Sequence, residues 1–311
     1  MTDMTVSRAG QINLAGATDA IFLKVFANEV LQTFLETNVM KGLHTTRSIA
    51  DGKSASFPVI GTTVASYHVP GTEMLGSTIP SAEKIILIDG LLVSNYWIPR
   101  IDEAMSHFDI RAPYSELLGR ALGLKYDKQC LQLVALAARS AASITGGFGG
   151  SVLTNPAFDT DGEALAEGIF DAAQALDEKD VPLEERYMVV KPKHYHLMTR
   201  STKVLNRDWG GAGVYSDGKV FRVAGINIVK SNNVPSSVIA AETGAANTYN
   251  GTFTNTVGLL FHKSAIGTVE LLSLGMEKEY SVRHQSTFAL AKMAVGHGIL
   301  RPEAAVEFVK A

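Results

Sequence analysis

Residues 112–142, APYSELLGRALGLKYDKQCLQLVALAARSAA, form an uninterrupted helical pattern of unusual length. The stretch has no proline after Pro113, and polar positions recur at helical spacing opposite an apolar face. The polar positions are Glu116, Arg120, Gly123, Asp127 and Gln132, and the apolar ones are Leu117, Leu118, Ala121, Leu124 and Leu131. At about 1.5 Å per residue this helix would be on the order of 45 Å long, severalfold longer than an average globular helix.

Upstream of this helix, residues 47–99 have the pattern of strands separated by turn residues. Apolar alternation marks residues 54–59, and residues 83–97 form two β-branched and aromatic runs that Asp89-Gly90 interrupts. Turn-forming residues lie between them, at Pro70, Gly71, Gly76 and Pro80. The sequence therefore predicts a long hairpin with an irregular tip. Such an arm has little core of its own and needs a partner to be stable.

Further elements are predicted on both sides of these two regions. An amphipathic helix is expected over residues 20–35, with Thr18 and Asp19 as suitable N-cap residues. Downstream, the patterns predict a loop at 143–161, helices at 162–176 and 192–200, strands at 187–191, 220–230, 256–262 and 277–294, and mostly loop at 231–255. Helices and strands together indicate an α+β fold.

Composition excludes several classes of protein. The chain has 311 residues, of which 46% are hydrophobic and 19% charged, as in ordinary globular domains. A net charge of −3 leaves no basic footprint for tight nucleic-acid binding. We expect no membrane span and no secretory signal, because no apolar run is long enough and the start lacks the basic-then-apolar order. The single cysteine, Cys130, predicts a buried thiol and rules out an internal disulfide framework.

No motif indicates a catalytic or metal centre. The glycines at 146, 147, 149 and 150 follow a helix and lack a Lys-Ser/Thr pair, so they predict a mobile loop instead of a phosphate cradle. His194 and His196 would lie on different faces of a helix, which favours solvated or locally bonded imidazoles over a metal pair. The acidic pairs Asp102-Glu103 and Glu184-Glu185 are explained by helix capping and solvation. A GxSxG elbow is absent.

Several stretches resemble the major capsid proteins of short-tailed bacteriophages of the autographivirus type. They are IFLKVFANEVLQTF (21–34), TRSIADGKSASFPVIGTT (46–63), EKIILIDGLL (83–92), IDEAMSHFDIRAPYSELLG (101–119), GLLFHKSAIGTVEL (258–271) and AVGHGILRPEAA (294–305). They cover about the first 120 and the last 55 residues, in the order that the family has. Residues 125–255 match the family only in pattern, as in LDEKDVPLEERYMVV (176–190).

This resemblance implies the tailed-phage capsid fold, also called the Johnson fold. In that scheme residues 1–46 are an N-terminal arm and 47–99 an extended loop that lies over a neighbouring subunit. Residues 100–155 and 275–311 would form the peripheral domain with its spine helix, and 156–274 the axial domain. We expect intersubunit contacts at Phe22, Phe26, Phe34, Arg47, Phe57, Pro70, Gly71, Gly76, Pro80, Trp97 and Arg301.

The resemblance further implies self-assembly as hexamers and pentamers into an icosahedral shell that encloses double-stranded DNA without strong sequence-specific binding. A scaffolding protein and a portal are expected partners, and the virion, assembled in the bacterial cytoplasm, is the expected location. The protein would not be an enzyme and would need no cofactor. Two alternatives stay open: an encapsulin-like shell, and a hydrolase without a recognisable motif. Particle size separates them, because a shell reaches megadaltons and an enzyme does not.

Two local predictions follow. The arm from Arg47 to Pro99 should have few contacts with its own core, and deletion of residues 68–81 should leave a soluble subunit that fails to close shells. The segment Gly296-His297-Gly298 to Arg301-Pro302-Glu303 is interpreted as a structural join where subunits meet. Its glycines would permit backbone turns, Pro302 would fix one φ angle, and Arg301 would satisfy several acceptors.

Overall fold

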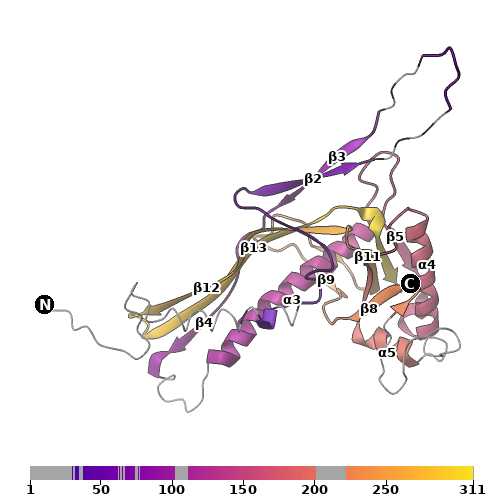
Figure 1. Ribbon diagram of the computed structural model, residues 1–311. Coiled ribbons are helices and arrows are strands. Elements are labelled where there is room, and N and C mark those ends of the chain that lie inside the picture. Colours follow the sequence, from indigo (N-terminus) through magenta and orange to yellow (C-terminus); the bar gives the residue numbers. More distant parts are fainter. Residues whose placement is uncertain are drawn as a thin grey trace. The chain divides into compact units, whose positions relative to one another are not determined.

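The computed structural model describes residues 30, 32–34, 38–61, 63, 65, 67–73, 76, 78–101, 111–200 and 222–310 (Figure 1). The chain divides into two compact units, each of which is described by itself. The first unit comprises residues 1–38, 91–125 and 272–294, and the second comprises 39–90, 126–271 and 295–311. Helices and sheets occur together, which confirms the predicted α+β class. The predicted helix at 20–35 lies largely outside the described residues.

The long helix predicted at 112–142 is confirmed as α3 (Arg111–Ala138), with 28 residues. In the first unit its exposed positions include Tyr114 and Leu117, whereas nearly every residue of its second-unit part is buried. Gly119 explains how another segment packs on the first part: a Cβ there would lie 2.5 Å from the carbonyl oxygen of Val30. The missing side chain therefore lets Val30, Thr33 and Phe34 approach α3 closely.

A six-stranded sheet forms the centre of the second unit. Its order is β5-β14-β11-β6-β8-β7, and its strands are β5 (Ser151–Thr154), β14 (Ala305–Val309), β11 (Thr256–His262), β6 (Arg186–Val190), β8 (Ile226–Lys230) and β7 (Arg222–Val223). The short helix η1 (Pro156–Asp159), α4 (Gly162–Asp177) and α5 (Pro192–Arg200) lie beside the sheet (Figure 1). All seven residues of β11 are buried, as the apolar run from Val257 to Phe261 at its centre leads one to expect.

A four-stranded sheet has the order β1-β12-β13-β4. Its strands are β1 (Thr45–Ser48), β12 (Ile266–Ser281), β13 (Ser286–Ile299) and β4 (Leu92–Pro99). β1 pairs in parallel with residues 267–270 of β12, within the second unit. β4 pairs antiparallel with residues 286–293 of β13, within the first unit.

A separate hairpin consists of β2 (Ser54–Ile60) and β3 (Ser81–Leu87), which pair antiparallel with each other in a two-stranded sheet. Figure 1 shows it projecting away from α4, α5 and the six-stranded sheet of the same unit. A second short pair, β9 (Val238–Ile239) and β10 (Gly251–Thr252), lies in the predicted loop region, and η4 (Pro302–Ala304) precedes β14.

Most of the downstream predictions are confirmed, and three are corrected. The predicted hairpin over 47–99 is wrong in extent, because β4 pairs with β13 instead of folding back on β2. The predicted loop at 143–161 contains β5 and η1. The strand region predicted at 277–294 is part of two longer strands, β12 and β13.

The predicted domain scheme stays a prediction, and the sheet pairing shows where it needs refinement. β14 lies in one sheet with β11 and β6, although residues 305–309 were placed in the peripheral domain and 256–262 in the axial domain. The C-terminal strand is thus built into the same sheet as the middle of the chain.

Candidate functional site

The projecting hairpin has two chemically different faces. Ala55, Val59 and Ile86 are buried and Phe57 is partly buried, whereas Ser54, Ser56 and Pro58 are exposed, so the predicted alternation is confirmed. At the base of the hairpin, Ala55 and Ile86 form a buried cluster with Val269 and Leu300. The base is therefore held by the hairpin's own chain. The expectation that the whole arm over 47–99 makes few such contacts is wrong for this base and for β1 and β4.

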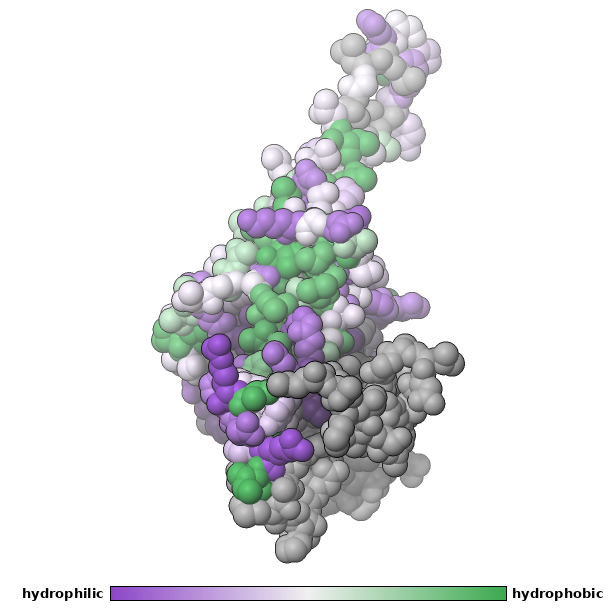
Figure 2. Space-filling model, turned by 90° about the vertical axis from the view of Figure 1, so that its left-hand side faces the viewer, coloured by the Kyte–Doolittle hydropathy of each residue, from purple (hydrophilic) through white to green (hydrophobic). Residues whose placement is uncertain are grey.

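The hairpin exposes large apolar side chains from its base to its tip. Their exposed fractions are 66% for Ile60, 63% for Val69, 50% for Ile79 and 60% for Ile85, and Tyr67 is fully exposed. Pro70, Gly71 and Gly76 at the tip are also exposed. Figure 2 shows apolar side chains alternating with polar ones along this projection. A concentration of uncovered apolar side chains on a protruding element is typical of a surface that another protein covers.

Glycines in β12 and β13 make room for the hairpin to cross close to these strands. A Cβ on Gly296 would lie 1.9 Å from the carbonyl oxygen of Leu87, and one on Gly298 would lie 2.7 Å from Cγ1 of Ile86. On Gly267 it would lie 2.7 Å from Cδ1 of Leu300. The segment Gly296-His297-Gly298 was expected to form turns, which is wrong, because β13 runs through it without interruption. Its glycines instead let β3 pass at backbone contact distance.

Two of the predicted contact residues are bound within their own chain, Arg47 near the hairpin base and Pro80 at the far end of the paired strands. The guanidinium of Arg47 donates to the carbonyl oxygen of Ser56 at 2.9 Å and lies 5.7 Å from the centre of the Phe57 ring. Arg47 remains exposed, so these contacts orient it without covering it. Pro80 packs where the strands diverge, and the amide of Gly61 donates to its carbonyl oxygen at 2.8 Å.

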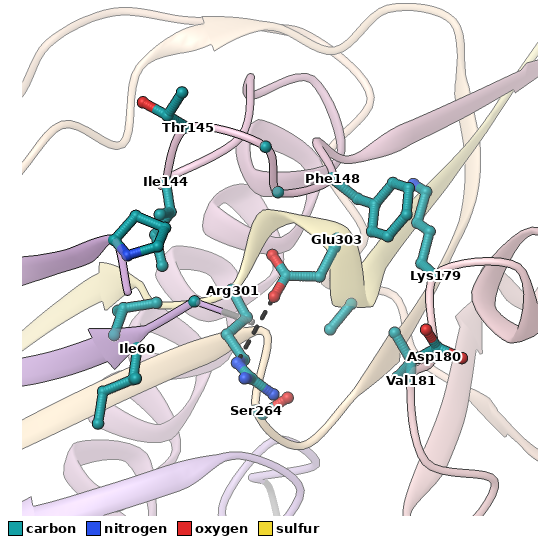
Figure 3. Close-up of a pocket in the computed structure, with 16 residues that line it drawn as sticks. Ile60, Ile144, Thr145, Phe148, Lys179, Asp180, Val181, Ser264, Arg301 and Glu303 are labelled. Atoms are coloured by element: carbon teal, nitrogen blue, oxygen red, sulfur yellow. Dashed lines mark ion pairs between the residues drawn. The ribbon is translucent and has the colours of Figure 1, made fainter. Parts of the chain in front are cut away.

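A pocket of about 400 Å³ lies between the hairpin and the body of the second unit (Figure 3). Ile60 lines it from the hairpin, Phe148 from the glycine-rich loop, and Lys179, Arg301 and Glu303 from the body. Lys179 is hydrogen-bonded within its own chain, because its ammonium donates to the carbonyl oxygen of Gly149 at 2.7 Å and to Ser151 Oγ at 2.6 Å. Partial burial lowers the pKa of this ammonium.

Arg301 is half-exposed at the edge of this pocket. Its Nε lies 3.5 Å from Glu303 Oε1, and its backbone amide donates to the carbonyl oxygen of Ala265 at 3.2 Å. The predicted fixed backbone after it is present, since Pro302 begins η4. The guanidinium was expected to satisfy several acceptors, and Glu303 supplies one ion pair among the described residues. The expectation of several acceptors for its five N–H donors therefore stays a prediction.

The remaining predicted contact residues fall into three groups. Phe22 and Phe26 lie outside the described residues. Phe34 is 1% exposed, so its side chain is buried in its own chain and is not a surface contact. Trp97 is 49% exposed on β4, where its ring lies 4.7 Å from that of Phe288 and 5.3 Å from that of His284. Trp97 therefore keeps about half of its side chain uncovered by its own chain.

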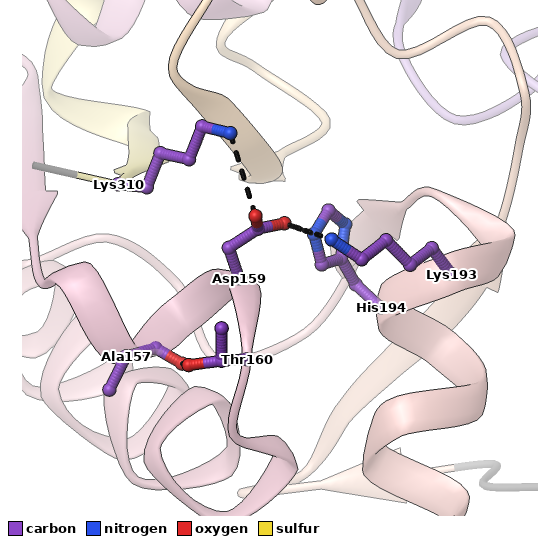
Figure 4. Close-up of polar contacts among 6 residues, drawn as sticks. All are labelled: Ala157, Asp159, Thr160, Lys193, His194 and Lys310. Carbon is purple, nitrogen blue, oxygen red and sulfur yellow. Dashed lines mark hydrogen bonds and ion pairs between the residues drawn. The ribbon is translucent and has the colours of Figure 1, made fainter.

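The H-x-H pair does not form a metal site. His194 is buried and its Nε2 lies 2.8 Å from Asp159 Oδ1, whereas His196 is exposed (Figure 4). Lys193 and Lys310 lie 2.7 Å and 3.5 Å from the same carboxylate. Hydrogen bonds from Lys193 and His194 hold the pKa of Asp159 well below its usual range. This cluster ties the end of β14 to α5 and η1, and the predicted locally bonded imidazole is confirmed for His194.

The glycine-rich loop, Cys130 and the acidic pair at Glu185 also have structural explanations. Gly150 is required by packing, because a Cβ there would lie 2.3 Å from the carbonyl oxygen of Ala138. Cys130 is buried as predicted, and burial raises the pKa of its thiol. Glu185 pairs with Lys263 at 2.7 Å, and Asp102 and Glu103 lie outside the described residues. No group of His, Cys, Asp or Glu among the described residues could hold a metal ion. In the same part of the chain, no helix is long and apolar enough to cross a membrane.

These elements place the protein in a known structural class. A chain in the solved capsid of cyanophage P-SCSP1u superimposes with a TM-score of 0.83 and 40% identity, covering 100% of this chain and 99% of that one. The long helix, the projecting hairpin and the two larger sheets are thus the parts of a tailed-phage capsid subunit. The match of the Gp10A-like major capsid protein model to residues 56–309 makes the assignment specific. The chain belongs to this family of major capsid proteins.

Curated relatives agree with the family assignment. The major capsid protein of Escherichia phage T7 is 33% identical over 318 residues, covering 94% of this chain and 92% of that protein. The major capsid protein of Enterobacteria phage T3 is 34% identical over 313 residues, covering 92% and 90%. The resemblance to short-tailed phage capsid proteins is confirmed, and the protein is a capsid component of the virion. Neither the encapsulin-like shell nor the hydrolase is favoured.

Proposed function

We propose that this chain assembles as hexamers and pentamers into an icosahedral shell around double-stranded DNA, and that the β2–β3 hairpin covers a neighbouring subunit. The observation that carries the proposal is the set of apolar side chains on the hairpin that their own chain leaves uncovered. Docking on a second copy would remove this surface from water, which is favourable by about 25 cal/mol per Å². Contacts between two different surfaces of identical subunits close into rings when related by rotation.

The role is structural, and no catalytic function is proposed. Assembly in the host cytoplasm with a scaffolding protein and a portal completes the proposal. The weakly acidic net charge of −3 supports a wall that encloses DNA without gripping its phosphates. Phe22, Phe26, Trp97 and Arg301 are retained as proposed contact residues, together with the hairpin tip.

Removing the tip tests this proposal directly. The antiparallel pairing ends at Ile60 and Ser81, so a short glycine–serine loop that joins Gly61 to Pro80 leaves both strands intact. We expect this variant to be soluble, with a circular dichroism spectrum close to that of the wild type, and to form no closed shells in sedimentation and electron microscopy. Closed shells at wild-type yield would rule out the hairpin as an assembly element.

A point variant with a matched control sharpens the same test. Ile85→Ser changes an apolar side chain on the hairpin that is 60% exposed, and Leu183→Ser changes one outside it that is 74% exposed. Both should leave subunit stability within about 0.5 kcal/mol of the wild type, because neither side chain is buried. We expect the yield of closed shells to fall at least tenfold for Ile85→Ser and to stay unchanged for Leu183→Ser. Equal yields for the two variants would contradict the proposal.

A further inference from the structure

Asp89, at the exit of the hairpin, binds a loop distant in sequence through both of its carboxylate oxygens. Its Oδ1 accepts from the amides of Ala246 and Asn247 at 2.7 Å and 3.0 Å, and from Asn247 Nδ2 at 3.0 Å. Its Oδ2 accepts from the hydroxyl of Tyr249. One carboxylate therefore receives four hydrogen bonds from the segment between β9 and β10, and bonds to an ionised acceptor are stronger than those between neutral groups.

Backbone hydrogen bonds surround this carboxylate and extend the connection to three segments. The amide of Gly90 donates to the carbonyl oxygen of Gly244 at 2.8 Å. The amide of Asp89 donates to the carbonyl oxygen of Val295 at 3.1 Å. Asn247 Nδ2 also donates to the carbonyl oxygen of Leu87 at 2.7 Å. Tyr249 is buried, and its hydroxyl accepts from the amide of His297 at 3.1 Å. The hairpin exit, the loop and β13 thus meet at Asp89.

This hydrogen-bonded cluster lies where it can determine the direction in which the hairpin projects. Among the strands that the structure describes, β2 and β3 pair only with each other, and their buried base consists of Ala55 and Ile86 against Val269 and Leu300. An apolar cluster of this size keeps the hairpin base attached to the body of the unit. It fixes the direction of the hairpin only weakly, because apolar contacts are not directional. Hydrogen bonds are directional, so a small change at the exit is amplified along the projecting strands.

We propose that Asp89 is the positioning residue that sets the direction of the hairpin and thereby selects the subunit geometry that can close a shell. The inference rests on the proposed docking role of the hairpin. The partner is a second copy of this chain, onto which the hairpin must be aimed before the apolar side chains can be covered. The sequence shows Asp89 only as half of an Asp-Gly turn signal, and the residues that donate hydrogen bonds to it lie more than 150 positions away.

Replacing Asp89 by asparagine exchanges one acceptor oxygen for an NH₂ donor, with little change in the shape of the side chain. The Asn amide can still accept from Ala246 and Asn247 through its oxygen, but its NH₂ group then faces the Tyr249 hydroxyl. That hydroxyl already accepts from the amide of His297. Its own hydrogen would have to turn to the carbonyl oxygen of His297, which lies 3.5 Å away. Asp89→Asn therefore removes the charge-assisted hydrogen bond that the hairpin exit accepts from Tyr249 and leaves at most a weaker bond, donated to a hydroxyl that already accepts from His297.

The direction of the hairpin can be measured in the unassembled full-length chain by pulsed electron-spin distance measurements. Spin labels on Ile60→Cys and Leu183→Cys report the hairpin against the body of the same unit, because both positions are exposed. The native thiol, Cys130, is fully buried and will not be labelled. We expect Asp89→Asn to widen the distance distribution at least twofold. Asp51→Asn, an exposed carboxylate before β2, is the matched control and should leave the distribution unchanged.

The same variants are then assembled and sedimented. We expect Asp89→Asn to lower the fraction of closed shells at least tenfold and Asp51→Asn to have no effect. Tyr249→Phe, which removes one bond to Asp89, should change both measurements in the same direction and by less. It keeps the proposal testable if Asp89→Asn fails to fold.

The outcomes separate this proposal from the docking role on which it rests. An unchanged distance distribution in Asp89→Asn and Tyr249→Phe overturns the positioning role, whatever the shell yield. A widened distribution with a wild-type shell yield also overturns it, because hairpin direction then does not govern closure. Shells formed by the chain without the hairpin tip instead refute docking, and the distance measurement still shows whether Asp89 orients the hairpin.

Discussion

Strands β11 and β3 belong to the same unit but differ in how far their own chain buries them. β11 is buried at all seven positions and pairs with β14 on one side and β6 on the other. β3 pairs with β2 alone and alternates between exposed and covered positions. The free energy gained from β11 is therefore realised when the subunit folds. In the proposed docking, much of the free energy available from the hairpin is realised only when a second subunit covers it, so substitutions in the two strands should fail in different assays.

The largest effect on subunit stability is expected in the central strand. Phe261 is fully buried in β11, and Phe261→Ala should lower the free energy of unfolding by about 4 kcal/mol through lost burial and the cavity left behind. Chemical denaturation of the unassembled chain measures this loss. Ile85→Ala on the hairpin is the counterpart and should change it by less than about 0.5 kcal/mol. A similar loss in both variants would remove the distinction between the strands.

Acid should weaken the body of the second unit through His44. Its Nδ1 lies 2.8 Å from the carbonyl oxygen of Met40 and its Nε2 lies 2.7 Å from Thr268 Oγ1. Burial lowers its pKa to about 4 from the usual histidine value of 6.5. Between these values the unfolded chain binds a proton that the folded chain does not, so stability falls as the pH decreases from 6.5 to 4.

The His44 contribution amounts to about 3 kcal/mol over this range. It is fully present above pH 6.5, and the loss levels off below pH 4. Unfolding curves across the range should therefore be steeper in pH for the wild type than for His44→Gln. His284→Gln, which changes an exposed imidazole, is the control and should keep the wild-type slope. Parallel slopes for wild type and His44→Gln would show that His44 does not carry this dependence.

The crossing of β3 over β13 should be sensitive to a single methyl group. Gly296→Ala would force apart the backbones of residues 87 and 296, and we expect a loss of about 2 kcal/mol. Gly275→Ala in β12 adds the same group where the nearest atom is 3.8 Å away, and it should be nearly neutral. The measurement is again denaturation of the unassembled chain. A neutral Gly296→Ala would mean that the crossing can relax without cost.

The smallest effect on the isolated subunit is expected at the pocket edge. Arg301→Lys keeps the charge but loses the planar fork, so it should weaken assembly while circular dichroism and subunit stability stay unchanged. Shell yield by sedimentation and the thermal stability of the particles are the measurements. Wild-type values for both would eliminate the proposed contact role of Arg301.

The sequence predicted the parts whose structure depends on local pattern. Helices α3, α4 and α5 follow from 3.6-residue periodicity, and buried β11 follows from a short apolar run between turn signals. The hairpin was extended too far because residues 92–99 have the same strand pattern as residues 81–87. Alternation reveals which side chains share a face, but it does not reveal whether the partner strand is β2 or the distant β13.

Other features escaped prediction because their causes are tertiary. β5 has only four residues in a glycine- and serine-rich region, where it is held by pairing with β14 at the far end of the chain. Gly296 was singled out correctly, but for a turn, since a glycine that permits a close crossing has the same local signal. The acceptor role of Asp89 depends on a loop that no short-range pattern connects to it.

The open hairpin also has a consequence for the subunit before assembly. A two-stranded sheet has an unpaired edge on each strand, and such edges invite pairing with other chains and aggregation. Pro58 lies in the middle of β2, where it has no N–H to donate to an incoming strand, and Glu83 and Lys84 place charges on β3. We expect these residues to limit indiscriminate strand addition before the subunit is incorporated into a shell. Replacing Pro58 by threonine should therefore promote edge-to-edge aggregation of the free subunit and reduce the recovery of soluble protein.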